Sequence, residues 1–438
     1  MPATPDTAPQ ELRLRVIPAL AEVDAAAWDA CANPQLVTAV DAVCEAAAAA
    51  PAEVQPSSQL SPYNPFISYD FLHSLEASGS ATARTGWQPR HVLAETADGS
   101  ILGAVPCYLK SHSRGEYVFD RGWAEAYERA GGQYYPKLQL SVPFTPATGR
   151  RLLLRPGPQA EAVRAGLAAG LIELCQRHEA SSVHVTFMPE AECQFLVERG
   201  FLHRTDQQFH WENAGYGSFD AFLEALSARK RKTIRRERRD ALAPGISVHW
   251  LTGRDLTEEA WDAFFAFYME TGSRKWGRPY LTRKFYSLVG ERMADKIVLI
   301  MAKRAGRFIA GAINFIGSDT LFGRHWGAIE HHPFLHFELC YYQAIDFAIA
   351  RGLKWVEAGA QGEHKLARGY LPVTTHSAHY IADPGLRRAI ADYLKRERAY
   401  VEAAGGELAA AAPFRKDLEH DPEKWDPVFG KDHAETKG

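Results

Sequence analysis

The sequence predicts an α/β (α+β) fold with mixed, mainly antiparallel sheets, and it predicts that this fold occurs twice in tandem. Strand-length apolar runs alternate with helix-length segments along the chain, which is typical of α/β proteins. Landmark residues recur in the same order in the two halves, as they do in internal repeats. The length of 438 residues suits two domains of about 200 residues each.

Each half opens with a strand-like run and a helix that carries Trp-Asp-Ala, at 28–30 and at 261–263. A pair of hairpin-like strands follows, at 91–109 and at 297–316. The closing segments match best, because Gly200 and Gly369 each precede a histidine by ten residues. The alternative is that two unrelated α/β domains share common elements.

The landmarks divide the chain into domains, and the first copy is the longer one. Its extra length predicts two insertions, and insertions of this kind often shape a binding cleft. The expected segments are a disordered N-terminus at 1–10, a first domain at 11–212 with insertions at about 31–62 and 113–155, a second domain at 213–385, and a C-terminal helix and tail at 386–438.

Composition limits the possible classes of protein. Hydrophobic residues make up 46% of the chain, so it can bury a core, and its net charge of −3 argues against a general nucleic-acid coat protein. The six cysteines form no C-x-x-C pair, as is usual for reduced cytosolic proteins. The apolar runs are too short to span a membrane, and the first ten residues do not resemble a signal peptide. We therefore expect a cytoplasmic protein with no integral membrane segment.

A strongly basic helix is predicted between the two domains, at 219–242. Apolar residues recur at helical spacing after Ser218, a favourable N-cap, and Pro244-Gly245 ends the pattern. Residues 229–239 carry eight basic residues and one acid, a net +7, so the other 427 residues carry −10. We expect Arg231, Arg235 and Arg236 to bind the phosphates of a tRNA, a nucleotide-linked substrate or an anionic membrane. The alternative is a solvated charged face.

The loop 359–369 is the strongest candidate for chemistry, because it follows a short strand and combines glycines with four ionisable groups. Acyl transfer to an amine needs a base and donors for the oxyanion. Glu363 or His364 would supply the base, and Lys365 or Arg368 the donors. An ordinary glycine-rich surface turn is the alternative.

Six further residues complete the candidate binding set, with simpler interpretations for two of them. Glu338 is also explained as an acid near a helix N-terminus, and Tyr341 as a core residue. The His- and Glu-rich stretch 325–338 contains no H-E-x-x-H, so we expect neither a metal site nor a permanently bound cofactor. The six residues are Gln361, His325, Glu338, Tyr341, Tyr134 and Tyr135.

Several long motifs resemble the FemAB-like N-acyltransferases of the GNAT superfamily, often labelled peptidoglycan biosynthesis/recognition proteins. The resemblance covers about 64–380. Its motifs are Asn64-Pro65-Phe66, Gly86-Trp87-x-Pro89-x-His91, Tyr134 to Leu138, Pro143 to Pro146, the basic helix, Leu335 to Glu338, and Gly359 to Lys365.

The resemblance implies tandem GNAT domains that transfer an acyl or aminoacyl group to an amine, such as a cell-wall precursor. It matches His364-Lys365 to a phenylalanine-lysine pair of the Fem transferases, so Lys365 inherits the candidate role. The chain has neither the long helical arm of those enzymes nor the pyrophosphate loop of acetyl-CoA enzymes. The donor therefore stays open among acyl-CoA, an acyl carrier and aminoacyl-tRNA. The alternative functions are a non-catalytic module that recognises RNA or a phosphorylated precursor, and an acetyl-CoA-dependent N-acetyltransferase.

Overall fold

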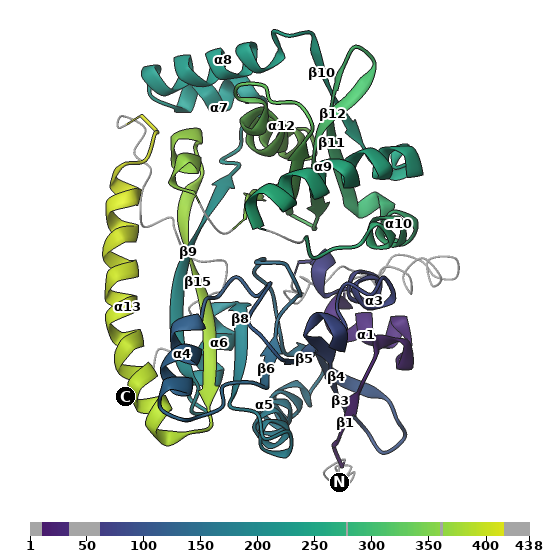
Figure 1. Ribbon diagram of the computed structural model, residues 1–438, viewed down its shortest axis with the longest axis vertical. Helices are drawn as coiled ribbons and strands as arrows, with labels where there is room; N and C mark the ends of the chain where they lie inside the picture. The colour runs from purple at the N-terminus through teal and green to yellow at the C-terminus, as the bar shows by residue number, and fades with distance from the viewer. Residues whose placement is uncertain (1–10, 35–61, 277–278, 360–361, 416–438) are drawn as a thin grey trace, which may run out of the picture.

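Two sheets organise the chain, a small one and a large one that both halves share (Figure 1). The computed structural model describes residues 11–34, 62–276, 279–359 and 362–415, and the expected disordered N-terminus, most of the first insertion and most of the tail lie outside these ranges. The small sheet is antiparallel, in the order β1 (Arg13–Ile17), β3 (His91–Glu95), β4 (Ile101–Val105) and β7 (Leu153–Leu154).

Helices cover both faces of the small sheet. Alternate residues of β3 and β4 belong to two different hydrophobic clusters, as the two-residue period of a strand requires. Helices α1 (Ala25–Ala32) and α3 (Tyr69–Ala77) contribute to one cluster and α5 (Ala160–Arg177) to the other.

The large sheet joins the two halves, because strands from one half pair with strands from the other. Strand β9 comes from the first half and lies between β14 and β15 of the second half. The eleven strands in order are β10 (Ile246–Leu251), β11 (Ile297–Arg304), β12 (Arg307–Ile316), β13 (Thr320–Ala328), β14 (Trp355–Glu357), β9 (Leu202–Glu212), β15 (Leu371–Ile381), β8 (Ser182–Met188), β6 (Lys137–Leu140), β5 (Cys107–Lys110) and β2 (Trp87–Pro89).

The predicted fold class is confirmed, since the sheets are mixed and mainly antiparallel. The two parallel pairs are β6 with β8 and β13 with β14. A helical crossover joins each pair, as parallel strands require. The crossover helix is α5 in the first half, and in the second half it comprises α11 (Leu335–Phe337), a π-helical turn at Glu338–Tyr342 and α12 (Gln343–Ala350).

The segment 113–155 is more than the insertion that the sequence predicts. It contains α4 (Arg121–Arg129), but it also supplies β6 and β7 to the two sheets. Because β6 pairs in parallel with β8 as β13 pairs with β14, β6 is a strand of the repeat. The predicted insertion boundaries are therefore too wide, because a four-residue strand lies between glycine- and proline-rich turns that hide it.

The prediction of one helix over 219–242 is wrong. The structure has α7 (Phe219–Ala225) and α8 (Ala228–Leu242), with Leu226 extended between them. Leu226 is buried and pairs with Phe414, and the Ser227 N–H donates to the Pro413 carbonyl at 2.9 Å. The C-terminal segment thus breaks the helix, an effect that local helical spacing does not reveal.

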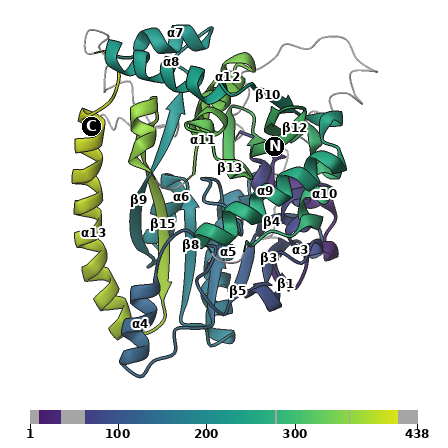
Figure 2. The ribbon, with the colours of Figure 1, turned by 45° about the horizontal axis from the view of Figure 1, so that its top comes forward.

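The remaining helices pack on the shared sheet. Helix α13 (Pro384–Ala410) runs along β9 and β15, and Figures 1 and 2 show it on that side in both views. Both views also place α7 and α8 together at one end of the molecule. Among the described residues, no helix is long and apolar enough to cross a membrane. The other helices are α6 (Glu190–Val197), α9 (Glu258–Trp276) and α10 (Arg283–Arg292).

Candidate functional site

The large sheet opens beyond Glu357, where the short strand β14 ends. Strand β14 has three residues and pairs with β13 on one side and β9 on the other. Strand β13 continues to Ala328, and β9 extends away to Leu202. Within the described ranges, no strand fills the space between them after Glu357. Openings at the carboxyl ends of parallel strands are where α/β folds usually bind ligands.

A β-bulge aims two side chains of β13 at this region. Gly323 pairs with Asn314 and Trp326 pairs with Ala312, so Arg324 and His325 both stand opposite the single residue between those partners. Bulges re-aim side chains and are common beside active sites.

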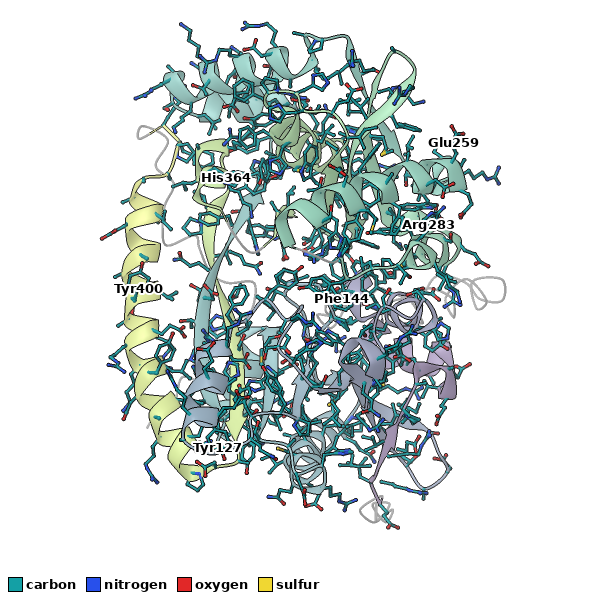
Figure 3. The ribbon with its side chains drawn as sticks, viewed as in Figure 1. Tyr127, Phe144, Glu259, Arg283, His364 and Tyr400 are labelled. Atoms are coloured by element: carbon teal, nitrogen blue, oxygen red, sulfur yellow. The ribbon has the colours of Figure 1, made fainter. Side chains whose placement is uncertain are left out.

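A loop of the first half forms one wall of the opening. Arg324 donates to the Phe144 carbonyl at 2.6 Å, and Gln208 Nε2 donates to the Pro146 carbonyl at 2.7 Å. The Thr148 backbone N–H donates to the Glu357 carboxylate. This loop contains the Pro143 to Pro146 motif, so both halves build the site. In Figure 3, Phe144 lies where the two halves meet.

Glu357 is the central acid of the opening. Its Oε1 lies 4.0 Å from His210 Nε2, and 12% of its side-chain surface is exposed. Burial raises the pKa of Glu357 to about 8, although the charge of Arg324 opposes this rise. The carboxyl group can therefore exchange a proton close to neutral pH.

His210 is a neutral neighbour of Glu357. Burial, with a contribution from the charge of Lys365, lowers the pKa of His210 to about 3. Because Gln208 donates through its amide nitrogen to Pro146, its Oε1 is free to accept from His210 Nε2 at 3.3 Å. Nε2 thus carries the ring proton, and Nδ1 is the acceptor.

The turn after β14 depends on its glycines. Gly359 and Gly362 have φ of 79° and 117°, and a short 3₁₀ helix follows at Glu363–Arg368. A Cβ on Gly362 would lie 2.4 Å from the His364 ring. Only glycine combines this backbone with this close approach.

Lys365 is buried in this turn, with 3% of its surface exposed, and its Nζ donates to the Gly359 carbonyl at 2.8 Å. Burial lowers the pKa of Lys365 to about 8. His364 Nε2 and the Tyr341 hydroxyl are 2.9 Å apart. The structure thus brings together three residues that the sequence singles out.

Arg368 holds this turn in place through contacts with α8 and with the turn itself. It donates to the Glu237 carboxylate at 2.9 Å and to the His364 carbonyl at 2.7 Å, and its guanidinium lies 3.5 Å from the centroid of the Phe337 ring. These contacts favour a positioning role for Arg368 over the oxyanion role that the sequence suggests.

The other predicted residues fall in different places. His325 packs on Tyr268 near the opening, with its pKa lowered to about 3 by burial. Glu338 is buried and pairs with Arg238 at 2.9 Å, which makes it a structural ion pair. Gln361 and the side chain of Glu363 lie outside the described part. The three predicted phosphate-binding residues of α8 (Arg231, Arg235 and Arg236) lie away from the opening, along a surface hollow.

Tyr134 and Tyr135 do not belong to this site. Tyr134 donates to Asp120 at 2.7 Å and packs in a cluster with Trp123 and Leu386, while the Tyr135 hydroxyl lies 2.8 Å from Ser113 Oγ. Tyr127 packs on the same cluster, and Figure 3 shows it at the opposite end of the molecule from His364.

Four residues of the opening are not predicted as site residues from the sequence: Glu357, Arg324, His210 and Gln208. Glu357 leaves one usable signal, an acid at the last position of a strand before a glycine-rich loop. Arg324 and Gln208 leave none, because a bulge and a strand pairing between the two halves place them.

Known structures match the chain at low identity and with TM-scores below 0.5. One, described as FemX, is 12% identical, covers 74% of this chain and 93% of its own, and has a TM-score of 0.47. L-PGS from Bacillus licheniformis is 9% identical, with 77% and 99% covered and a TM-score of 0.46. A tandem GNAT protein from the clavulanic acid biosynthesis pathway, without AcCoA, is 13% identical, with 85% and 99% covered and a TM-score of 0.40.

Sequence comparison identifies the family directly. No curated protein matches the chain significantly. A family profile does match it, over residues 19–416, which is most of the chain. The protein therefore belongs to the FemAB-like family, described as peptidoglycan biosynthesis/recognition.

Proposed function

We propose that this protein is an N-acyltransferase that joins an acyl or aminoacyl group to an amine at the opening beyond Glu357. The supporting observation is the Glu357 carboxyl group, which has a pKa of about 8 and lies between the Arg324 bulge and the neutral His210. An amine must lose a proton when it attacks an acyl carbon, and a carboxylate of this pKa is suited to accept it.

In the proposed reaction, the amine nitrogen attacks the carbonyl carbon of an ester or thioester. The C–N bond forms while Glu357 in its ionised form takes the proton from nitrogen. The C–O or C–S bond then breaks, and the oxygen or sulfur leaves with the bonding electron pair and receives the proton from Glu357, which returns to its ionised form. The developing oxyanion needs a positive charge held in place. Lys365 and Arg324 are the cationic groups of the turn and of the bulge that could supply it.

The family suggests a peptidoglycan precursor as the amine acceptor. The donor stays open among acyl-CoA, an acyl carrier and aminoacyl-tRNA. Each donor has a thioester or ester bond, so the same residues serve all three. If the donor is acetyl-CoA, the transferred group is an acetyl group and the protein is an N-acetyltransferase.

The test is amide formation, followed by mass spectrometry, with each donor and a set of cell-wall precursors. We expect Glu357→Gln and Lys365→Met each to lower kcat/KM by about 100-fold or more, in line with the loss of a base or an oxyanion donor. Glu198→Gln and Lys354→Met remove exposed charges outside the opening and should leave the rate unchanged. Full activity of the Glu357→Gln protein would remove Glu357 from the mechanism.

A further inference from the structure

Helix α8 has two faces with different partners. Its inward face carries the buried residues Ile234 and Ala241, and Glu237 accepts hydrogen bonds from Arg368 and from the Tyr342 hydroxyl. Arg238 also turns inward, to Glu338 and Asp346. This face anchors the helix to the π-helical turn and to the turn after β14, which carries Lys365 and Arg368 and is here called the candidate catalytic turn.

The outward face of α8 carries a stripe of five exposed cations. At 1.5 Å per residue they span about 15 Å along the crest of the helix. Two of them, Arg235 and Arg239, pair with the acids Asp220 and Asp240 on the surface. The others have no ion pair with any described residue. The five are Arg229, Lys232, Arg235, Arg236 and Arg239, here called the cationic stripe.

We propose that the cationic stripe docks the protein on an anionic phospholipid surface. Helix α8 lies at one end of the molecule, so a flat surface can reach the whole stripe (Figures 1 and 2). Clusters of four to eight Lys and Arg residues on a helix are typical of binding to anionic headgroups. The residues outside 229–239 carry a net −10, so the rest of the molecule is repelled from the same surface and the stripe sets the orientation.

The side chains around the stripe favour lipid over single-stranded RNA. Single-stranded RNA is bound through aromatic side chains on which bases stack. None of the large exposed hydrophobic residues in the described chain lies on α7 or α8. Helix α8 does not insert into the bilayer, because its apolar face is already buried in the protein. Docking is therefore electrostatic and reversible.

Docking would bring the candidate catalytic turn close to the lipid headgroups. Arg368 bonds to the inward face of α8, so the turn lies about one helix diameter, roughly 10 Å, below the stripe. If the proposed function holds, this placement suits a substrate carried by a membrane lipid. The docking itself does not depend on acyl transfer.

The experiment measures binding of the full chain to vesicles by flotation. Vesicles of 30% phosphatidylglycerol in phosphatidylcholine are compared with phosphatidylcholine alone, at low and at high salt. We expect binding only to the anionic vesicles, and its loss at high salt. Replacing Arg229, Lys232 and Arg236 with Gln should weaken binding about 100-fold, since each cation near the surface contributes about fivefold.

A matched control replaces three exposed cations of α13, Arg388, Lys395 and Arg396, with Gln. It removes the same charge and should keep vesicle binding. An equal loss in both variants would mean that net charge alone matters, and it would overturn the proposal. Absent vesicle binding, together with tight salt-dependent binding of a tRNA probe, would also overturn it and would assign the stripe to RNA. Neither result bears on acyl transfer, which is measured with a soluble acceptor.

Discussion

At the residue scale, the opening combines two ionisable groups whose pKa values burial moves toward each other. The pKa of Glu357 is raised to about 8, and that of Lys365 is lowered to about 8. Burial disfavours the charged form of both groups, although one is an acid and the other a base. The proposed function therefore relies on two groups that make folding less favourable when they are charged, as is common at active sites.

This arrangement makes a stability prediction with a definite sign. The folded pKa of Glu357 lies above its unfolded value, so the stability it contributes is present at low pH and is lost as pH rises to about 8. Glu357→Gln should therefore flatten the fall in the free energy of unfolding between pH 5 and pH 8, by a few kcal/mol at most. Urea denaturation at a series of pH values measures it. Equal pH profiles for the two proteins would contradict the raised pKa.

Some of these residues can be predicted from the sequence and others cannot, for a physical reason. Lys365 and His364 stand in one glycine-rich loop, so local spacing reveals them. Glu357 and His210 become neighbours only because β14 and β9 pair across 147 positions of the chain. Nothing in local composition encodes that pairing.

At the element scale, the candidate catalytic turn offers a test of whether its shape matters. Gly359 and Gly362 both have positive φ, but only at Gly362 would a Cβ meet another residue, the His364 ring. Ala at either position should cost about 1 kcal/mol or more through backbone strain. Gly362→Ala should in addition displace His364 from Tyr341 and lower kcat/KM well below that of Gly359→Ala.

Thermal denaturation and acyl transfer, measured on both variants, separate strain from displacement. The comparison is matched, because both glycines belong to the same turn and their φ values are both left-handed. Equal losses of activity in the two variants would show that the contact of Gly362 with His364 has no role.

The basic helix shows which features of an element local sequence patterns predict. Its charge, its N-terminal cap and its C-terminal stop are all present in the sequence, and residues 219–225 and 228–242 are helical. The break at Leu226 depends on the distant segment 413–415, which pairs with it. The same limit applies to β6, which the sequence assigns to an insertion.

At the scale of the whole molecule, the two repeats share a parallel strand pair, and among the described residues only the second leaves it open. In the first half, the loop that follows β6 forms hydrogen bonds with the part of β8 that β6 leaves unpaired. The Gly149 N–H donates to the Phe187 carbonyl at 3.0 Å, and Arg151 donates to the Thr186 carbonyl at 3.0 Å. Arg151 is fully buried, and three further backbone carbonyls accept from it. The two halves thus share a parallel strand pair but differ in their potential sites.

The shared sheet also predicts that the two halves do not fold alone. Strand β9 pairs with β15 through nine residue pairs, from His210 with Leu371 to Leu202 with His379, and with β14 on its other edge. A fragment of residues 1–212 would expose both edges of β9, and exposed strand edges promote aggregation. We expect fragments 1–212 and 213–438 to be unfolded or aggregated when expressed separately, and to form one soluble complex when expressed together.

Circular dichroism and size-exclusion chromatography of the fragments decide this point. The full chain should unfold in a single transition, because the large sheet and its hydrophobic clusters extend across both halves. A monomeric 1–212 fragment with cooperative unfolding would restore the simpler picture of two independent domains joined near residue 212. In that case the opening, with one wall from each half, would depend on docking of preformed domains, and interface substitutions such as Gln208→Ala would change activity without changing the stability of either half.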